Sequence, residues 1–439
     1  MHPIDLSADE LVSRLLKLSE DQTVCLLDSC GVGHLGSHLL IAGIFPIKVH
    51  EITNDDPEQT LAFLDEKLSG EQAAMFTLSY DLGPKLEGIA SMHEGGDEPD
   101  VFLALFDALV VHDYHTGKTY LTGNESRFTQ IEREIGGVTV ARITPVTQRC
   151  AFSSNFTKDD YVSAIEEIME RIRCGDTYQT NLTQQLTIKL PKQTTPQSIF
   201  WNLRRDHPPP FAAFITRKDS TVVSASPERF FRVDGNRITT SPIKGTRPRG
   251  ITEAEDNAFR NELLSSQKDI AENTMIVDLL RNDLGRVCEF GSVKVEKLCD
   301  LEEHPTLFHL VSTITGELRK DVTPANILNA LFPSGSITGA PKISTMKIID
   351  EIETAPRGLS MGAIGLYVPS SQSQGPGPTS AWDMGHGTWD MSVAIRTITI
   401  RSNTAIFNVG GGIVIDSDPE KEYEESLLKA KALLDAAGD

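Results

Sequence analysis

The sequence predicts an α+β protein in which large, mostly antiparallel β-sheets are flanked by helices in an α/β sandwich. Most strand-like segments follow one another as neighbours or hairpin pairs, whereas a doubly wound parallel sheet requires strict alternation of strand and helix. The chain has 439 residues, of which 39% are hydrophobic. This length and composition indicate a globular protein with enough apolar surface for a large core.

The first third of the chain begins with a short amphipathic helix over residues 7–18, for which Ser7 is the expected N-cap. Apolar segments at 24–27 and 101–106 are bounded by glycine and aspartate and predict strands. The sequence places no chemical motif in this part of the chain.

The middle of the chain alternates longer elements. A helix is predicted over 158–173, with Gly175 and Asp176 ending it. The threonine-rich stretch 177–188 predicts a strand, and 222–231 predicts a strand, a turn and a second strand. Residues 253–286 form the longest helical pattern, which closes at Gly285.

The last part of the chain returns to strands and ends in a helix. Asp418 is the expected N-cap of a helix over 419–437, with Pro419 at its first position. Residues 369–389 are rich in serine, glycine and proline and predict a flexible surface loop. Strands are predicted at 308–315, 363–368, 392–400 and 405–409.

The net charge is −21, from 41 basic and 62 acidic residues, which disfavours nucleic acid and anionic membranes as partners. An anionic substrate would need a local basic cluster. The six cysteines form no C-x-x-C pair and are typical of reduced thiols in a cytoplasmic protein. No export signal is visible at the N-terminus, and the apolar run 39–45 is too short to span a bilayer.

Lys244 lies in the basic, glycine-containing segment 241–250, together with Arg247 and Arg249. Nearby cations and desolvation both favour the neutral amine, which is the nucleophilic form of lysine. Gly245 allows the backbone to approach a ligand. Lys244 is therefore a candidate for covalent chemistry, and the alternative is a basic turn that binds a carboxylate or faces water.

Two helical segments carry pairs of carboxylates three residues apart. Asp269 and Glu272 share a helix face that becomes apolar one turn later, and Glu422 and Glu425 are followed by Lys429. Oxygen ligands without neighbouring histidine or cysteine suit Mg²⁺ better than Zn²⁺. The two helices could therefore hold Mg²⁺, although exposed carboxylates are the common alternative, above all for the second pair.

Several other segments suggest ligand contacts. Residues 332–342 do not fit a Walker loop, although Ala340 and Pro341 could begin a helix whose N-terminus attracts anions. The glycines at 410–412 follow a predicted strand and form either a close approach to a ligand or an ordinary bend. Arg396 within an apolar strand requires an anionic partner, and His309 is more often a core histidine than a catalyst.

Together these segments resemble the chorismate-binding domain shared by anthranilate, aminodeoxychorismate and isochorismate synthases. The resemblance covers residues 147–437, and a weaker one covers 1–146 through 26–29 and 79–83. It implies two intertwined regions, 1–146 and 147–437, in one globule. The matching segments in chain order are 175–182, 226–230, 242–250, 271–286, 309–312, 335–342, Arg396, 410–412 and the acidic last helix.

Two positions bear on the branch of this family. Relatives that activate water carry a lysine base where this chain has Gln179, and glutamine cannot deprotonate water. Lys244 is typical of aminodeoxychorismate synthase component I, where anthranilate synthase usually has alanine. The resemblance therefore implies conversion of chorismate and ammonia to 4-amino-4-deoxychorismate, on the route to p-aminobenzoate and folate. The alternatives are anthranilate synthase component I and a non-catalytic chorismate-binding relative.

The resemblance also implies roles for individual residues. Lys244 would attack the ring at C2 while Glu228 protonates the leaving hydroxyl and later acts as a base. Mg²⁺ would be held by Glu272, Glu422 and Glu425, with Asp269 in support. Substrate contacts are expected from Gly245, Thr246, His309, Thr338, Arg396, Gly410, Gly411, Gly412 and Lys429.

The expected partners are chorismate, ammonia and a separate glutamine amidotransferase subunit, because no segment resembles a glutaminase. Many relatives bind tryptophan in the N-terminal region, so tryptophan is a further candidate ligand there. One departure from the family pattern concerns a tyrosine that usually follows a Gly-Ala-Ile-Gly-like motif. Here Leu366 fills that position and Tyr367 comes next, which predicts a displaced substrate contact.

Overall fold

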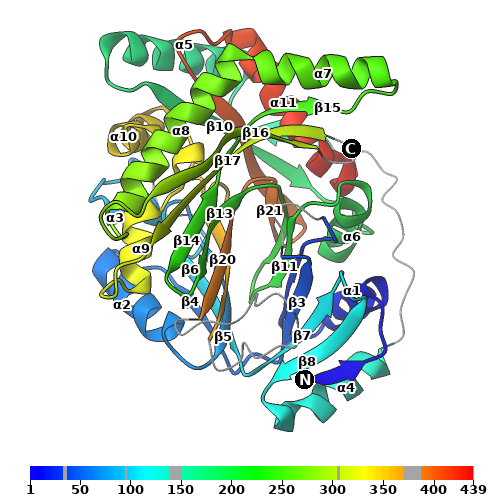
Figure 1. The fold of residues 1–439 in the computed structure, drawn as a ribbon. Coiled ribbons are helices and arrows are strands. Elements are labelled where there is room, and N and C mark those ends of the chain that lie inside the picture. Colours follow the sequence, from blue (N-terminus) through cyan, green and yellow to red (C-terminus); the bar gives the residue numbers. More distant parts are fainter. Residues whose placement is uncertain (33–36, 94–95, 139–150, 304–306, 370–386, 439) are drawn as a thin grey trace.

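The computed structural model describes residues 1–439 except 33–36, 94–95, 139–150, 304–306, 370–386 and 439. Its framework is two large β-sheets that lie face to face, with helices on their outer sides (Figure 1). Every pair of strands described in the two sheets is antiparallel, as in β10 (Gln179–Lys189) with β22 (Thr404–Ile413). The predicted α+β class with large antiparallel sheets is therefore confirmed.

The first sheet has twelve strands among the described residues. Strands from both ends of the chain meet at its centre, where β2 pairs with β11 and β21 lies between β12 and β22. In spatial order the strands are β1 (His2–Ile4), β8 (Lys118–Gly123), β7 (Ala108–Asp113), β3 (Leu39–Ile44), β2 (Val24–Asp28), β11 (Phe211–Thr216), β12 (Thr221–Ser226), β21 (Thr397–Arg401), β22, β10 and β18 (Gly339–Ala340), with β9 (Phe152–Ser154) also beside β10.

The second sheet has ten strands in the part of the chain that the structure describes. Here too strands of residues 1–146 join strands of the later region, because β5 pairs with β19. The order is β15 (Ile243–Pro248), β17 (Leu307–Glu317), β14 (Arg237–Ser241), β13 (Arg229–Asp234), β20 (Thr388–Val393), β19 (Ala363–Val368), β5 (Ala73–Leu78), β6 (Val101–Phe106) and β4 (Lys48–Ile52), with β16 (Lys294–Glu303) also beside β17.

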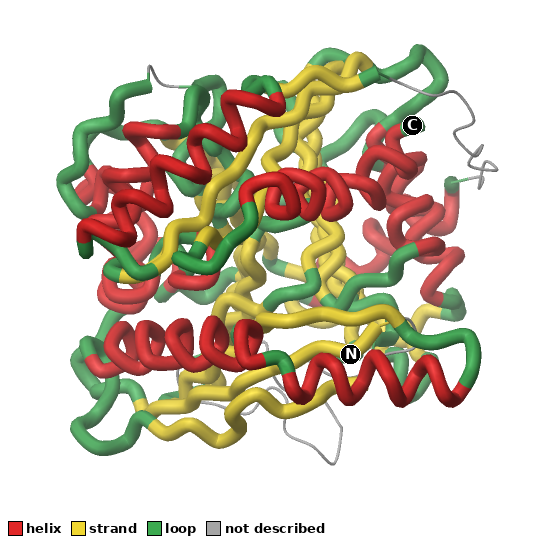
Figure 2. The backbone as a smooth tube through the Cα atoms, turned by 90° about the horizontal axis from the view of Figure 1, so that it is seen from above, coloured by secondary structure: helices red, strands yellow, loops and turns green. Residues whose placement is uncertain are grey.

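Apolar side chains form three main layers. Met75, Phe102, Ala213 and Ile364 belong to a core cluster that joins the two sheets. The outer face of each sheet packs against helices, which Figure 2 shows along the sides of the yellow strands. The α-helices are α1 (Ala8–Leu18), α2 (Pro57–Leu68), α3 (Leu82–Leu86), α4 (Phe128–Gly137), α5 (Lys158–Cys174), α6 (Pro196–Asp206), α7 (Glu253–Ser265), α8 (Gln267–Gly285), α9 (Pro324–Leu331), α10 (Lys342–Ile352) and α11 (Pro419–Ala437).

Local signals place most helices correctly. Ser7 forms a capping box with Glu10 at the start of α1, and Asp418 caps α11 with Pro419 in its first turn. Gly175 ends α5 in the left-handed conformation, with φ 85°, which a residue without a Cβ adopts freely. These three helices are confirmed to within a residue or two.

Two predicted elements are wrong in their extent. The single helix expected over 253–286 is two helices, because Ser266 has an extended ψ of 100° and its hydroxyl caps α8 by accepting from the Asp269 N–H. The single strand expected over 392–400 is β20 and β21, separated by residues 394–396. Arg396 lies in this break with φ 49°, so it is not inside a strand.

The glycines at 410–412 are not the ordinary bend that the sequence allowed, and their close approach to a ligand stays a prediction. They do not follow a strand but belong to β22, where Gly410, Gly411 and Gly412 pair with Thr183, Leu182 and Asn181 of β10. Most of the loop predicted at 369–389 lies outside the described residues. The five described cysteines are free thiols. Among the described helices, none combines the length and the apolar character required to cross a bilayer.

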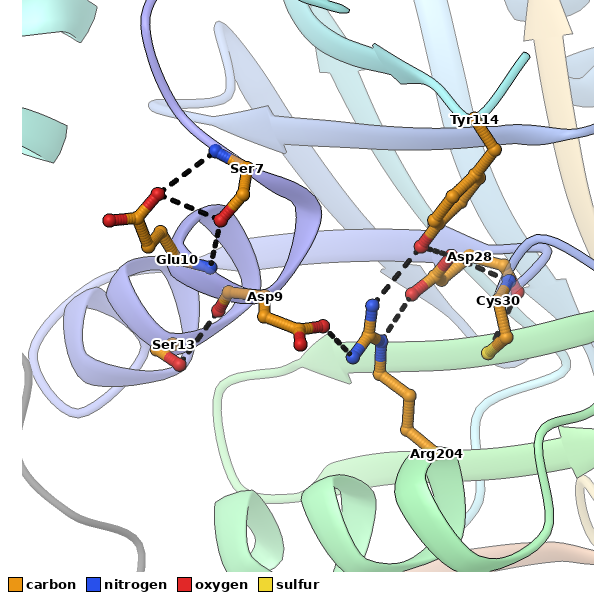
Figure 3. Close-up of polar contacts among 8 residues, drawn as sticks. All are labelled: Ser7, Asp9, Glu10, Ser13, Asp28, Cys30, Tyr114 and Arg204. Carbon is orange, nitrogen blue, oxygen red and sulfur yellow. Dashed lines mark hydrogen bonds and ion pairs between the residues drawn. The ribbon is translucent and has the colours of Figure 1, made fainter. Parts of the chain in front are cut away.

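A polar network ties the first helix to the first sheet (Figure 3). The buried Asp28 carboxylate accepts from Arg204 Nε and from the Tyr114 hydroxyl, both at 2.7 Å. Arg204 also donates to Asp9 of α1, at 2.6 Å. Arg204 therefore joins α6, β2 and α1, and Asp28 of the 26–29 motif is fully occupied by contacts within the protein.

Candidate active site

Glu228 lies at the turn between β12 and β13 and is buried, with 6% of its surface exposed. Its backbone N–H donates to the Ser226 hydroxyl at 3.3 Å, and its carbonyl accepts from the Val393 N–H at 3.1 Å. Burial raises the pKa of the Glu228 carboxyl to about 7, although a hydrogen bond from Ser336 and the charge of Lys244 oppose this rise. A carboxyl in this range can both donate and accept a proton near neutral pH.

Lys244 lies on β15 and is partly buried. Its Nζ atom donates to the Ser336 carbonyl at 3.4 Å. Its charge also lowers the pKa values of Glu228, Glu272 and Glu425, so the ammonium lies near carboxylates of both α8 and α11. The Lys244 side chain is thus partly buried and bound to the Ser336 carbonyl, so it does not lie on a turn that only faces water.

The expected crowding of Lys244 by two arginines is not found. Arg247 pairs with Glu262 at 2.8 Å and with Asp269 at 3.3 Å. Arg249 pairs with Asp256 at 2.7 Å and lies over the Phe308 ring at 4.6 Å. Carboxylates on α7 and α8 thus neutralise both guanidinium groups, and the argument for a neutral Lys244 from neighbouring cations is wrong.

Ser336 joins Glu228 to Lys244, and the sequence reasoning did not identify it. It lies in the short 3₁₀ turn Gly335–Ile337 and is buried. Its hydroxyl contacts Ser334 at 3.0 Å and hydrogen-bonds the Glu228 carboxyl, while its carbonyl accepts from Lys244. The signal was present in segment 332–342, which was tested only as a phosphate loop.

Gly245, Thr246 and His309 surround Lys244 on β15 and β17. Gly245 has φ +84°, and a Cβ there would lie 2.9 Å from Leu263 and 3.0 Å from Asp269, so only glycine fits between the strand and α8. Thr246 Oγ1 lies 2.8 Å from His309 Nδ1. His309 is buried, with 6% exposed, so the two side chains form one polar pair beside the lysine.

The carboxylates of α8 and α11 converge through Lys268. Its Nζ lies 3.2 Å from Glu422 Oε1 and 4.0 Å from Glu272 Oε1. Burial raises the pKa of Glu272, and its Oε1 atom is buried without a hydrogen-bond partner. Glu422 is buried and accepts from the Ser417 hydroxyl at 2.8 Å. The first carboxylate of the α11 pair is thus not on a solvated helix face.

Glu425 and Lys429 form the outer part of this cluster. Glu425 Oε1 lies 2.8 Å from Lys429 Nζ, and Glu425 keeps about half of its side chain exposed. The pKa of Glu425 is lowered: burial opposes this direction, but the charges of Lys429, Lys268 and Lys244 outweigh it. Lys429 also donates to the Gly410 carbonyl at 3.1 Å. An ideal Cβ on Gly411 would lie 3.3 Å from Lys429 Nζ, so β22 and the lysine are in close contact.

The donor chemistry of this cluster fits Mg²⁺, because Glu272, Glu422 and Glu425 are oxygen ligands and Glu272 has a buried oxygen without a hydrogen-bond partner. The arrangement is not a preformed cage. No group of three or more acidic, histidine or cysteine side chains in the described ranges is close enough to hold a metal ion. Lys268 provides the counter-charge between Glu272 and Glu422, and Asp269 is engaged by Arg247.

The remaining predicted site residues occupy different positions. Thr338 is fully buried and donates to the Ser334 carbonyl at 3.0 Å, so its hydroxyl stabilises the turn that holds Ser336. Burial lowers the pKa of Arg396, and no ion pair to its guanidinium is found in the described part of the chain. Its carbonyl accepts from the N–H of Ala225, three positions before Glu228, at 2.9 Å.

Gln179 is fully buried at the start of β10, and neither atom of its side-chain amide has a hydrogen-bond partner among the described residues. An ideal Cβ on Gly412 would lie 2.3 Å from Gln179 Nε2. Gly412 therefore makes room for this amide. A buried, unsatisfied amide is unusual and is expected where a ligand completes the hydrogen bonds.

Tyr367 does not take over the place of the tyrosine expected at Leu366. Successive residues of β19 point to opposite faces, and Leu366 packs in the core between the sheets. Tyr367 packs on the other face against Trp389, and its hydroxyl donates to the Gly70 carbonyl at 3.1 Å. The tyrosine is thus a core residue.

A small cavity of about 50 Å³ lies between the sheets beside the 26–29 motif. Leu27, Asp28, Phe211 and Ala213 are among the residues that line it. This volume has room for a few water molecules.

A buried carboxyl with a raised pKa beside a lysine, opposite carboxylates on two helices, defines an enzyme with acid–base machinery. Residues 45–435 match the family described as chorismate binding enzyme, and the chain belongs to that family. It is 32% identical to anthranilate synthase component 1 of Pseudomonas putida, over 98% of this chain and 92% of that protein. It is 35% identical to aminodeoxychorismate synthase component 1 of Bacillus subtilis, over 81% and 75%.

The fold is shared with a solved structure of anthranilate synthase component I from Streptococcus pneumoniae. The TM-score is 0.74 at 26% sequence identity, and the match covers 94% of this chain and 90% of that chain. The relatives thus include proteins named anthranilate synthase component 1 and aminodeoxychorismate synthase component 1, at the similar identities of 32% and 35%.

Proposed function

We propose that the protein is aminodeoxychorismate synthase component I, which converts chorismate and ammonia to 4-amino-4-deoxychorismate on the route to p-aminobenzoate and folate. One observation carries this proposal: the Lys244 amine and the protonatable Glu228 carboxyl meet at Ser336. A nucleophile and a proton donor on either side of one turn suit displacement of a ring hydroxyl.

The proposed reaction has two displacements. Once the Lys244 ammonium has released its proton to solvent, the nitrogen lone pair forms a bond to C2 of the ring, the double bonds shift, and the C4–O bond breaks as Glu228 gives its proton to the departing hydroxyl, which leaves as water. Glu228, now ionised, takes the extra proton from the Lys244 nitrogen. Ammonia then attacks C4, the double bonds shift back, and the C2–N bond to Lys244 breaks. Through Glu228, the proton lost by the new C4 ammonium returns to the leaving amine.

Chorismate is a dicarboxylate, and several cations of the site could bind it. Arg396 is partly buried with a guanidinium free of protein carboxylates in the described residues, and Lys429 lies against the glycines of β22. Mg²⁺, when bound by Glu272, Glu422 and Glu425, would supply positive charge for a substrate carboxylate. This charge would reconcile an anionic substrate with an acidic site.

Gln179 supports amination over hydration. Its amide is buried where water-activating relatives carry a lysine base, and an amide cannot remove a proton from water. The incoming nucleophile is therefore proposed to be ammonia, which is nucleophilic without a base. A separate glutamine amidotransferase subunit is the proposed source. Tryptophan binding in the N-terminal region stays a prediction.

Anthranilate synthase component I is the second candidate, favoured by the 32% identity over 98% of this chain. In that case ammonia would add at C2 and the product would be anthranilate. Lys244 is the residue that separates the two proposals, because a lysine that occupies C2 directs ammonia to C4.

The test is to incubate the purified protein with chorismate, Mg²⁺ and ammonium chloride and to identify the product by chromatography. A second sample receives a 4-amino-4-deoxychorismate lyase. The proposal expects p-aminobenzoate only after the lyase is added. Anthranilate without lyase would replace it with the second candidate, and unchanged chorismate in both samples would refute both.

A further inference from the structure

Arg357 makes the most extensive set of buried contacts next to the site. Its side chain is 1% exposed, and it forms an ion pair with Glu353, which is 3% exposed, at 2.7 Å. Its remaining donors reach two backbone carbonyls: Ile337 O at 2.9 Å and Asn181 O at 2.7 Å. Arg357 therefore clamps the 3₁₀ turn Gly335–Ile337 to strand β10.

Glu353 extends this clamp to β10 by a second route. Its Oε1 atom accepts from the Thr183 N–H at 2.7 Å and from the Thr183 hydroxyl at 2.9 Å. Asn181 and Thr183 are the residues that pair with Gly412 and Gly410 of β22. The pair of Arg357 and Glu353 thus fixes the turn relative to the strand whose partner strand contacts Lys429.

The motif at 79–83, which the chemistry above does not use, packs directly against Arg357. The Tyr80 ring lies 4.4 Å from the guanidinium carbon, and the Asp81 carboxylate accepts from the backbone N–H groups of Arg357 and Gly358 at 3.2 and 2.9 Å. Burial raises the pKa of Asp81 to about 6. A Cβ on Gly83 would lie 2.5 Å from the Pro333 ring, just before the turn. The motif therefore supports both the clamp and the start of the turn.

The clamped turn holds both groups of the proposed chemistry. The Ser336 hydroxyl hydrogen-bonds Glu228, and the Ser336 carbonyl accepts from Lys244. Ile337, whose carbonyl accepts from Arg357, directly follows Ser336 in the chain. A displacement of this turn moves the hydrogen-bond partners of the acid and of the amine together, and a shift of about 1 Å in a reacting group can lower the rate on the order of 10²-fold.

We propose that Arg357 is a positioning residue. Its hydrogen bonds to the Ile337 and Asn181 carbonyls, supported by the packing of residues 79–83, fix Ser336 and thereby align Glu228 and Lys244. This inference rests on the proposed function for its kinetic consequence but not for its structural one. It also gives the first region of the chain a part in the site, through a motif that touches no reacting group.

The experiment compares Arg357→Lys with a matched control, Arg217→Lys. Arg217 is also 1% exposed, is paired with Glu98 and lies 5.4 Å from the Phe102 ring, but it contacts no part of the turn. Lysine keeps the positive charge of Arg357 but lacks the planar guanidinium group, which donates to two carbonyls and a carboxylate at once. Glu353→Gln, which preserves side-chain volume, is the second variant. It is used if thermal denaturation shows that Arg357→Lys is not folded.

Two readouts are measured on the full chain. With chorismate and ammonium chloride, Arg357→Lys is expected to lower kcat about 10²-fold with little change in the chorismate KM, whereas Arg217→Lys leaves both unchanged. In protein labelled with ¹³C at glutamate carboxyls and assigned with Glu228→Gln, the Glu228 titration is expected to move to higher pH in Arg357→Lys, because the Ser336 hydrogen bond that lowers it is lost.

The outcomes separate this inference from the proposed function. A Glu228 titration that is unchanged in Arg357→Lys, or that moves equally in Arg217→Lys, overturns the positioning role. A wild-type protein that leaves chorismate unchanged refutes the proposed function, and the carboxyl titration still decides the role of Arg357.

Discussion

Lys268 of α8 and Glu422 of α11, which are 154 residues apart in the chain, form an ion pair of 3.2 Å between the two helices. Glu422 is 7% exposed, so Lys268 provides the positive charge that this carboxylate requires within the protein. The same ammonium lies 4.0 Å from Glu272. A lysine thus occupies the place between the two carboxylates where the sequence predicts a divalent cation.

The first prediction is that Lys268→Met strengthens Mg²⁺ binding. Without the ammonium, Glu272 and Glu422 lose their counter-charge. A divalent cation then no longer competes with Lys268 for the two carboxylates. Isothermal titration of the variant with MgCl₂ is expected to show at least a tenfold lower Kd than the wild type. Glu425→Gln in the same background should weaken the binding again. Equal affinities in wild type and Lys268→Met would exclude a metal between these two carboxylates.

The second prediction concerns the pH dependence of stability. The pKa of Glu228 is about 7 in the folded protein against an ordinary value of 4.5. Between these values the folded state keeps a proton that the unfolded state releases, so this group favours folding at low pH and disfavours it as pH rises towards 7 and above.

Glu228→Gln removes this dependence. The difference in unfolding free energy between the variant and the wild type is expected to shift by about 3 kcal/mol in favour of the variant from pH 4.5 to pH 8. Denaturant unfolding at the two pH values measures it. Asp81, whose pKa is raised to about 6, contributes equally to both proteins and cancels. A shift in the opposite direction would contradict the assignment of a protonated Glu228.

The third prediction is that Lys244→Ala lowers ammonium-dependent turnover of chorismate on the order of 10³-fold, because the variant lacks the nucleophile of the first displacement. Chorismate binding should be retained, since Arg396 and Lys429 are unchanged. Steady-state kinetics and calorimetric titration measure the two quantities. Turnover within a factor of a few of the wild type would remove the covalent step while leaving the family assignment intact.

The fourth prediction is that Arg204→Met destabilises the fold by about 3–5 kcal/mol, because it leaves the fully buried Asp28 carboxylate without its guanidinium partner. Arg205→Met is the control. Arg205 is about half exposed and pairs with Asp206 on the surface, so its loss should change stability by less than about 1 kcal/mol. Equal effects of the two substitutions in denaturant unfolding would show that the network in Figure 3 does not stabilise the protein.

Local signals in the sequence correctly predicted those helix ends at which a single residue determines the boundary. Ser7, Gly175 and Asp418 each set a helix end through their own backbone or side-chain chemistry. The break at Ser266 was missed because a helical pattern of apolar residues continues across it. Only the packing of α7 and α8 around β15 shows that the chain changes direction there.

For the candidate site, the positions of the predicted residues can be compared with the structure, whereas their chemical roles stay predictions. Glu228, Lys244 and the carboxylates of α8 and α11 are brought together by strands and helices far apart in the sequence. The pairing of Arg247 and Arg249 with α7 and α8 could not be predicted, because it depends on where those helices pack. Ser336 was missed for the same reason, since the role of a serine in a glycine-rich turn depends on which side chains pack against that turn.

The order of strands in the first sheet has a consequence for synthesis. β21 and β22, which include residues 397–413, fill the space between β12 and β10. Until residues 397–413 have been synthesised, the edges of β12 and β10 that face this space therefore lack their partner strands. Such late, long-range pairing slows folding and exposes strand edges to other chains. We therefore expect the nascent protein to depend on chaperones until its final strands emerge.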